Sequence, residues 1–116
     1  MTLNLLVIRT AQPEVLATFY SHLDLQFNCH CHGNGPMHYS ANIDGLVFEI
    51  YPLLKNQAQA DSSLRLGFQV KDLNKLLESL RKEKINILQE PKYAEWGYFA
   101  VIRDPDGRKI ELTQTK

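Results

Sequence analysis

Five residues of the kinds that bind metals occur within ten positions, in the stretch CHCHGNGPMH: Cys29, His30, Cys31, His32 and His38. Thiolates and imidazoles are the ligands that zinc and other transition metals prefer. On a strand, however, side chains alternate between the two faces. The cysteines should therefore point one way and the first two histidines the other, which predicts two separated pairs rather than one site, and two free thiols.

A second candidate for metal chemistry is the stretch RDPDGR at 103–108, which contains Asp104 and Asp106. Aspartate at the first position, proline at the second and glycine at the fourth are typical of a type I turn. We therefore expect these two carboxylates to have a structural role.

Length and charge limit the classes of function. The chain has 116 residues, with thirteen basic and thirteen acidic side chains and no block of either sign. This predicts one domain whose partner is a small molecule or another protein, and it excludes the charge pattern of nucleic-acid or anionic-membrane binding. The opening residues MTLNLLVIRT contain too short an apolar run for a signal peptide or a membrane span, so we expect a cytoplasmic protein.

One pattern of elements occurs twice in the chain. Strands are predicted at 3–9, 25–32, 37–42 and 46–51 around a helix opened by Pro13, whose apolar stripe is Leu16, Phe19, Tyr20 and Leu23. Strands at 64–70, 85–89, 98–103 and 109–114 surround a second helix, N-capped by Asp72, whose stripe is Leu73, Leu76, Leu77 and Leu80. The predicted fold is therefore a single α+β domain of two βαβββ modules, residues 1–54 and 64–116, joined by a linker at 55–63.

Alternation within the strands assigns a face to each side chain. DGLVFEI at 44–50 aligns without a gap with DGRKIEL at 106–112, so Glu49 and Glu111 point away from the apolar, helix-covered face. Two modules side by side would form a half-open eight-stranded sheet that encloses a cleft. A two-residue turn at Asp44 and Gly45 would pair Ser40 with Glu49 and bring His38 close to Glu49.

This organisation, with the stretches HGNGPMHY, VFEIYP and EWGYFAVIRDPDGRKIEL, resembles the vicinal oxygen chelate superfamily. That superfamily includes glyoxalase I, bleomycin-resistance proteins and extradiol dioxygenases. The resemblance implies that the first and fourth strands of each module are neighbours and that the second strand lies at the edge. It also implies that short members form homodimers, in which each cleft is formed either by both modules of one chain or by modules exchanged between chains. It also implies a divalent ion held by a His or Gln and a Glu from each module, and Glu49 and Glu111 match the two glutamates.

The other two ligand positions do not match, because they fall on Leu5 and Arg65, which have no lone pair to offer. We therefore expect no metal and no other cofactor. The alternative is nickel, zinc, manganese or iron on a rearranged set of Glu49, Glu111 and His38.

Arg65 is expected to replace the ion as the cation between the two glutamates. It would form a structural cluster with Glu49 and Glu111 or, together with His38 and Tyr51, orient a ligand. Tyr93 and Trp96, in a loop at 91–97, would either stack on that ligand or pack beneath the loop. His30 lies on the edge strand and is expected to be remote from Glu49 and Glu111.

Two hypotheses follow for function. The first is a metal-independent protein that binds a small polar or aromatic molecule in the cleft. The second is a metal-dependent lyase, isomerase or dioxygenase-like enzyme that uses Glu49 or Glu111 as a general base.

Overall fold

A computed structural model of the chain describes residues 1–30 and 33–116, so Cys31 and His32 and the predictions made for them lie outside the described residues. Its elements, in chain order, are β1 (Leu5–Thr10), α1 (Pro13–Ser21), β2 (Asn28–His30), β3 (His38–Ile43), β4 (Leu46–Pro52), β5 (Leu66–Val70), α2 (Leu73–Lys82), β6 (Ile87–Ala94), β7 (Gly97–Arg103) and β8 (Lys109–Gln114).

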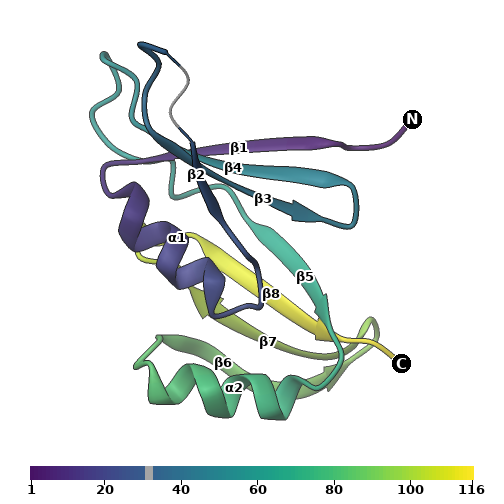
Figure 1. The fold of residues 1–116 in the computed structure, drawn as a ribbon. Coiled ribbons are helices and arrows are strands. Elements are labelled where there is room, and N and C mark those ends of the chain that lie inside the picture. The colour runs from purple at the N-terminus through teal and green to yellow at the C-terminus, as the bar shows by residue number, and fades with distance from the viewer. Residues whose placement is uncertain (31–32) are drawn as a thin grey trace. The chain divides into compact units, whose positions relative to one another are not determined.

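The chain divides into two compact units, Met1–Asp61 and Ser62–Lys116. Each unit is a βαβββ module with one four-stranded sheet, in the order β1-β4-β3-β2 in the first and β5-β8-β7-β6 in the second. The first and fourth strands of each module pair in parallel. The predicted α+β fold of two repeated modules is therefore confirmed, together with the strand order that the resemblance implied (Figure 1).

Helix α1 begins where the sequence predicts. Pro13 occupies its first turn, where a missing N–H costs little, and Thr10 Oγ1 accepts a hydrogen bond of 3.1 Å from the Gln12 N–H. The buried face of α1 packs on β1, β3 and β4, and the Tyr20 ring meets the Phe48 ring edge-on at 5.1 Å. Leu23 is not part of this stripe, because the helix ends at Ser21.

Helix α2 is fixed at its N-terminus by two side chains. Asp72 accepts from the Lys75 N–H at 3.1 Å, as predicted, and Gln114 of β8 accepts from the Leu73 N–H at 3.0 Å. The buried face packs on β6, β7 and β8 and consists of Leu73, Leu77 and Leu80. Leu76, the fourth predicted member, is half-buried.

The β3–β4 hairpin sets the register on which the site depends. Asp44 and Gly45 both have positive φ, 49° and 94°, as the central residues of a type I′ turn require. Ile43 pairs with Leu46 and Ser40 with Glu49, as predicted. Phe48 and Ile50 are consequently buried under α1, while Glu49 points to the opposite face.

Two predicted boundaries were wrong. Of the strand expected at 25–32, only Asn28–His30 pairs with β3 among the described residues, because Phe27 turns inward to pack its ring 5.9 Å from Phe48. The loop expected at 91–97 is mostly strand, since β6 extends to Ala94 and only Glu95 and Trp96 form the turn. Pro91 is tolerated there because β6 is an edge strand with shifts of register on either side of Gln89.

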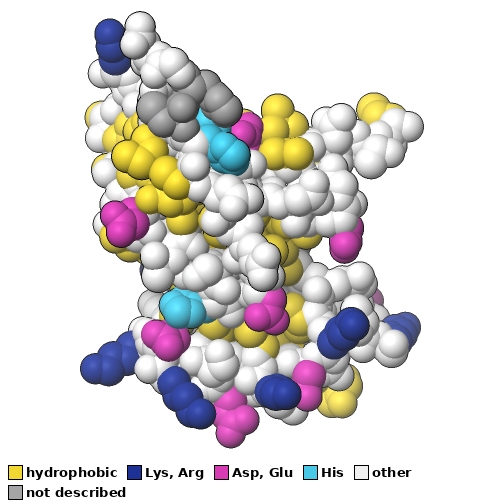
Figure 2. Space-filling model, viewed as in Figure 1, with side chains coloured by type: hydrophobic (Ala, Val, Ile, Leu, Met, Phe, Trp, Pro, Cys, Tyr) yellow, Lys and Arg dark blue, Asp and Glu magenta, His cyan; other side chains and the backbone are white. Residues whose placement is uncertain are grey.

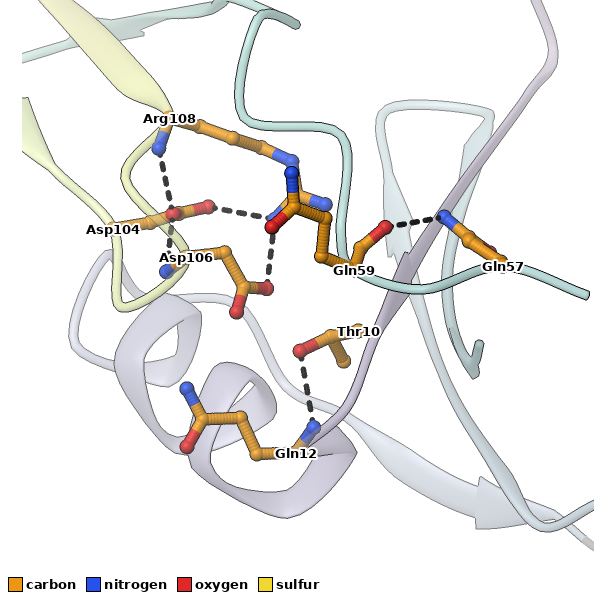
Figure 3. Close-up of polar contacts among 7 residues, drawn as sticks. All are labelled: Thr10, Gln12, Gln57, Gln59, Asp104, Asp106 and Arg108. Carbon is orange, nitrogen blue, oxygen red and sulfur yellow. Dashed lines mark hydrogen bonds and ion pairs between the residues drawn. The ribbon is translucent and has the colours of Figure 1, made fainter. Parts of the chain in front are cut away.

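The stretch 103–108 forms the predicted turn, in which the Gly107 N–H donates to the Asp104 carbonyl oxygen at 2.9 Å. Both carboxylates contact the guanidinium of Arg108: Asp104 at 3.2 Å and Asp106 at 3.0 Å (Figure 3). Arg108 and Asp104 are almost fully buried, 1% and 3% exposed. These acids therefore hold the turn together, as expected.

The surface agrees with the charge balance of the sequence. Figure 2 shows basic and acidic side chains interspersed over the region that carries α2. Within the part of the chain that the structure describes, no helix is long and apolar enough to cross a membrane.

Candidate functional site

The open face of the first sheet carries a row of four side chains, one from each strand. Arg9 of β1 is the register partner of Tyr51 of β4, and His30 of β2 is the partner of His38 of β3. The β3–β4 register, continued by one residue, sets His38 opposite Tyr51. These four residues, His30, His38, Tyr51 and Arg9, are called the aromatic row below.

Contacts along the aromatic row are close and ordered. The His38 and Tyr51 rings are stacked, with centroids 4.2 Å apart and planes within 6° of parallel. The Arg9 guanidinium carbon lies over the Tyr51 ring, 5.1 Å from its centroid, in a cation–π contact. The same side chain donates a hydrogen bond of 3.1 Å to the Pro52 carbonyl oxygen. At the other end, the His30 ring lies 5.6 Å from the His38 ring at 30°.

His38 also connects the aromatic row to Glu49. Its Nε2 lies 3.4 Å from Glu49 Oε2, which confirms the predicted proximity, and its Nδ1 lies 3.3 Å from the Pro36 carbonyl oxygen. A carbonyl oxygen only accepts, so Nδ1 donates there. The same imidazole thus contacts the backbone at Pro36 and the carboxylate of Glu49, and these two contacts orient its ring.

Exposure differs along this face in a way that separates the roles of its residues. The His38 side chain is 7% exposed and that of Glu49 is 20% exposed, while Arg9, His30 and Tyr51 are all half-buried. His38 is thus best placed to hold its neighbours, and the others to meet a ligand. Val7 of β1 is the register partner of Glu49, and Leu5 lies two residues before Val7 on the same strand. Both are exposed apolar side chains on the same face as Glu49.

The matching face of the second unit is chemically different. Glu111 is half-buried and lies between Gly67 of β5 and Val101 of β7. The position that corresponds to His38 is Phe99, since it pairs with Thr113 as His38 does with Tyr51. The Trp96 ring, on a residue that is 58% exposed, lies 5.1 Å from the Phe99 ring. This unit repeats the glutamate but not the histidine.

The divalent ion implied by the superfamily does not fit these residues. Leu5 has a hydrocarbon side chain, and Arg65 is an exposed cation just before β5. Val7 and Gly67, the direct register partners of the two glutamates, have no side-chain atom that could bind a metal either. Among residues 1–30 and 33–116, no three His, Cys, Asp or Glu side chains lie close enough together to share an ion.

Other predicted site residues fall in separate places. Glu49, His38 and Tyr51 lie together on the first sheet, whereas Arg65, Glu111 and Trp96 belong to the second unit. The ion pairs found among the described residues do not include one between Arg65 and Glu111. A cluster of Arg65 with both glutamates would join the two units and stays a prediction. Tyr93, placed by the sequence in a loop, is a strand residue of β6. It is 82% exposed, and its ring lies 4.6 Å from that of Tyr98 at an angle of 37°.

Two members of the aromatic row were missed. His30 was expected to be remote from the glutamates and was not offered as a ligand-binding residue, but its ring lies 5.6 Å from that of His38, which itself contacts Glu49. Arg9 was not considered. The signal for it was the alternation of β1, which puts Arg9 on the same face as Leu5 and Val7.

The fold and strand order define the class of the protein as that of glyoxalase and bleomycin-resistance proteins. The model of the glyoxalase-like domain family matches residues 17–115, and the chain belongs to this family. No curated protein matches the sequence.

Three solved structures show how widely the fold is shared. TnmS3, an antibiotic binding protein from Streptomyces sp. CB03234, has 20% identity and a TM-score of 0.79 over 100% of this chain and 97% of its own. A glyoxylase/bleomycin resistance protein/dioxygenase domain from Frankia sp. EAN1pec has 14% identity and a TM-score of 0.76 over 100% and 98%. An integron cassette protein from V. cholerae has 20% identity and a TM-score of 0.75 over 100% and 96%. At these identities the likeness concerns the fold alone.

Proposed function

We propose that this chain binds a small organic molecule without a metal, on the open face of the first sheet and in the cleft predicted from the sequence. The observation that carries the proposal is the aromatic row, with His38 joined to Glu49 at 3.4 Å, next to the exposed apolar side chains of Leu5 and Val7. A few polar groups set in a largely apolar and aromatic surface are typical of ligand sites. The name of the Streptomyces neighbour, an antibiotic binding protein, is in keeping with such a role.

Glu49 is proposed to orient the ligand through hydrogen bonds, while His38 holds Glu49 and Tyr51 in place. The second hypothesis, a metal-dependent lyase, isomerase or dioxygenase-like enzyme, would need the rearranged ligand set of Glu49, Glu111 and His38, because Leu5 and Arg65 offer no lone pair.

The test is a nuclear magnetic resonance screen of the full chain against a mixed library of neutral, acidic and basic small molecules, with the metal content measured after purification without chelator. Bound compounds should shift the backbone amides of β1, β3 and β4. His38→Phe keeps a ring against Tyr51 but loses the Glu49 contact, and it should weaken binding by about tenfold, the worth of one hydrogen bond to a charged group.

His22→Phe is the matched control, because His22 lies at the C-terminal end of α1 and outside the aromatic row. It should leave affinity unchanged. Stoichiometric metal that disappears in Glu49→Gln would overturn the proposal in favour of the enzyme. Binders that shift only amides outside β1, β3 and β4 would overturn the assignment of the site.

A further inference from the structure

We propose that the aromatic row selects a planar aromatic acid, a ligand with a flat π face and a carboxylate or similar anion at one end. This inference rests on the proposed function and names the class of ligand for the same site. It follows from the orientation of the rings, whose edges face away from the sheet, and from the Arg9 guanidinium beside them.

The rings of the aromatic row stand side by side on the sheet. Neighbouring strands are about 4.8 Å apart, and the His38 and Tyr51 centroids, on neighbouring strands, are 4.2 Å apart with nearly parallel planes. The 5.6 Å between His30 and His38 is of the same order. A ligand therefore meets the edges of these rings and cannot slip between them.

A surface of ring edges favours negative charge. Aromatic rings are negative on their faces and positive around their edges, so the face of a flat aromatic ligand is attracted to such a row. The phenol hydroxyl of Tyr51 adds a hydrogen-bonding group to the aromatic row. The aromatic row thus prefers a π face to an aliphatic surface of equal size.

Arg9 gives the aromatic row a cationic end. Its guanidinium sits against the Tyr51 ring, and this group matches carboxylates in both charge and shape. Glu49, the carboxylate of this face, lies in the neighbouring row and is already in contact with His38 at 3.4 Å. An acid whose anion lies toward Arg9 and whose ring lies over the edges of Tyr51 and His38 fits this end of the row.

The second unit supplies an internal comparison. Its corresponding row is Lys92, Phe99, Thr113 and Gln69, which follows from the same register relations. Gln69 stands where Arg9 stands, and Thr113 replaces Tyr51. The cation of this row, Lys92, lies at the other end, with its Nζ 5.8 Å from the Phe99 centroid. Only the first unit places a guanidinium beside the ring of its fourth strand, and the inference is therefore made for the first unit.

The test compares three probes of nearly the same shape, benzoate, benzamide and benzamidine, which are anionic, neutral and cationic, with cyclohexanecarboxylate as an acid without a π face. Each is titrated into the full chain, and amide shifts of β1, β3 and β4 are followed by nuclear magnetic resonance. We expect benzoate to bind tightest, by about tenfold over benzamide, which is the gain of one charge-assisted contact.

Arg9→Gln should abolish the preference for benzoate, and Arg9→Lys should keep part of it. Arg81→Gln, which removes the same charge from the exposed side of α2, should leave the preference intact. Spectra of each variant report whether the fold is retained.

Equal or tighter binding of benzamide, benzamidine or cyclohexanecarboxylate would overturn the inference, as would the absence of a saturable benzoate shift in β3 and β4. If neutral or basic compounds nevertheless shift the same strands, the proposed function stands while the ligand class falls. If nothing in the wider library shifts them, both fail.

Discussion

At the scale of single residues, the same side chain has different meanings in different surroundings. Asp104 and Asp106 were candidates for metal ligands by type, but both contact the buried guanidinium of Arg108. Glu49 is also paired, with His38, yet its side chain keeps 20% of its surface exposed on an open face. Burial and partner, more than residue type, distinguish an acid that holds the fold from one that can meet a ligand.

We predict that Asp104→Ala destabilises the protein by about 1.5–3 kcal/mol, because the buried Arg108 loses one of its carboxylate contacts and the N–H groups of Asp106 and Arg108 lose their acceptor. Glu90→Ala, which removes the partner of the exposed Arg81, should cost less than about 1 kcal/mol. Urea unfolding followed by circular dichroism measures both. Equal losses in the two variants would contradict the structural role given to Asp104.

Tyr39 predicts a pH dependence of stability. Burial raises the pKa of the Tyr39 phenol above its ordinary 10.0, and the charges of Cys29 and Glu14 and a hydrogen bond with Cys29 raise it further. The folded protein therefore binds this proton more tightly than the unfolded chain does. Stability from this source is complete below pH 10.0 and is lost as the pH rises from there through the raised pKa.

The measurement is the free energy of unfolding of the parent and of Tyr39→Phe across that range. The parent should lose stability faster than the variant as the pH rises, while below pH 10.0 the difference between them should stay constant. A constant difference across the whole range would refute the assignment.

At the scale of elements, local signals located the helices better than the edge strands. Asp72 and Pro13 act through neighbouring backbone groups, so the starts of both helices could be predicted. The ends of β2 and β6 depend on partners elsewhere in the sheet. Phe27 leaves its strand to pack on Phe48, and the shifted pairing of β6 with β7 admits Pro91.

Removal of a helix cap tests this local account. Asp72→Ala should cost about 1 kcal/mol, since the Lys75 N–H loses its acceptor. Gln12→Ala, at the corresponding position before α1, should change stability by less than about 0.5 kcal/mol, because Gln12 makes no side-chain cap. Thermal unfolding would compare them, and a loss in Gln12→Ala as large as in Asp72→Ala would contradict the account.

At the scale of the whole molecule, each unit has one sheet with a helix on one face. The other face of the first sheet carries exposed apolar side chains, among them Leu5 at 50% and Val7 at 37% exposure. Apolar side chains grouped on an open face are typical of surfaces that bind ligands or other chains. The superfamily resemblance adds that short members pair.

We therefore predict a homodimer. Light scattering coupled to size-exclusion chromatography should give twice the mass of one chain, and dilution should reveal dissociation if the interface is small. Leu5→Lys tests whether this face takes part, with Leu88→Lys, another exposed leucine, as the control. A monomer at every concentration would refute the prediction.

The sequence by itself determined the repeat, the two helices, the alternation of faces and the turn at Asp44 and Gly45. It thereby determined that His38 lies near Glu49, because a two-residue turn fixes every pair along its hairpin. Only the tertiary structure decided that Arg9 and His30 complete the row. Arg9 reaches Tyr51 through a parallel pairing of strands about forty residues apart, which no local turn fixes. His30 reaches His38 through a pairing of three residues, whose register depends on side chains packed beneath the sheet.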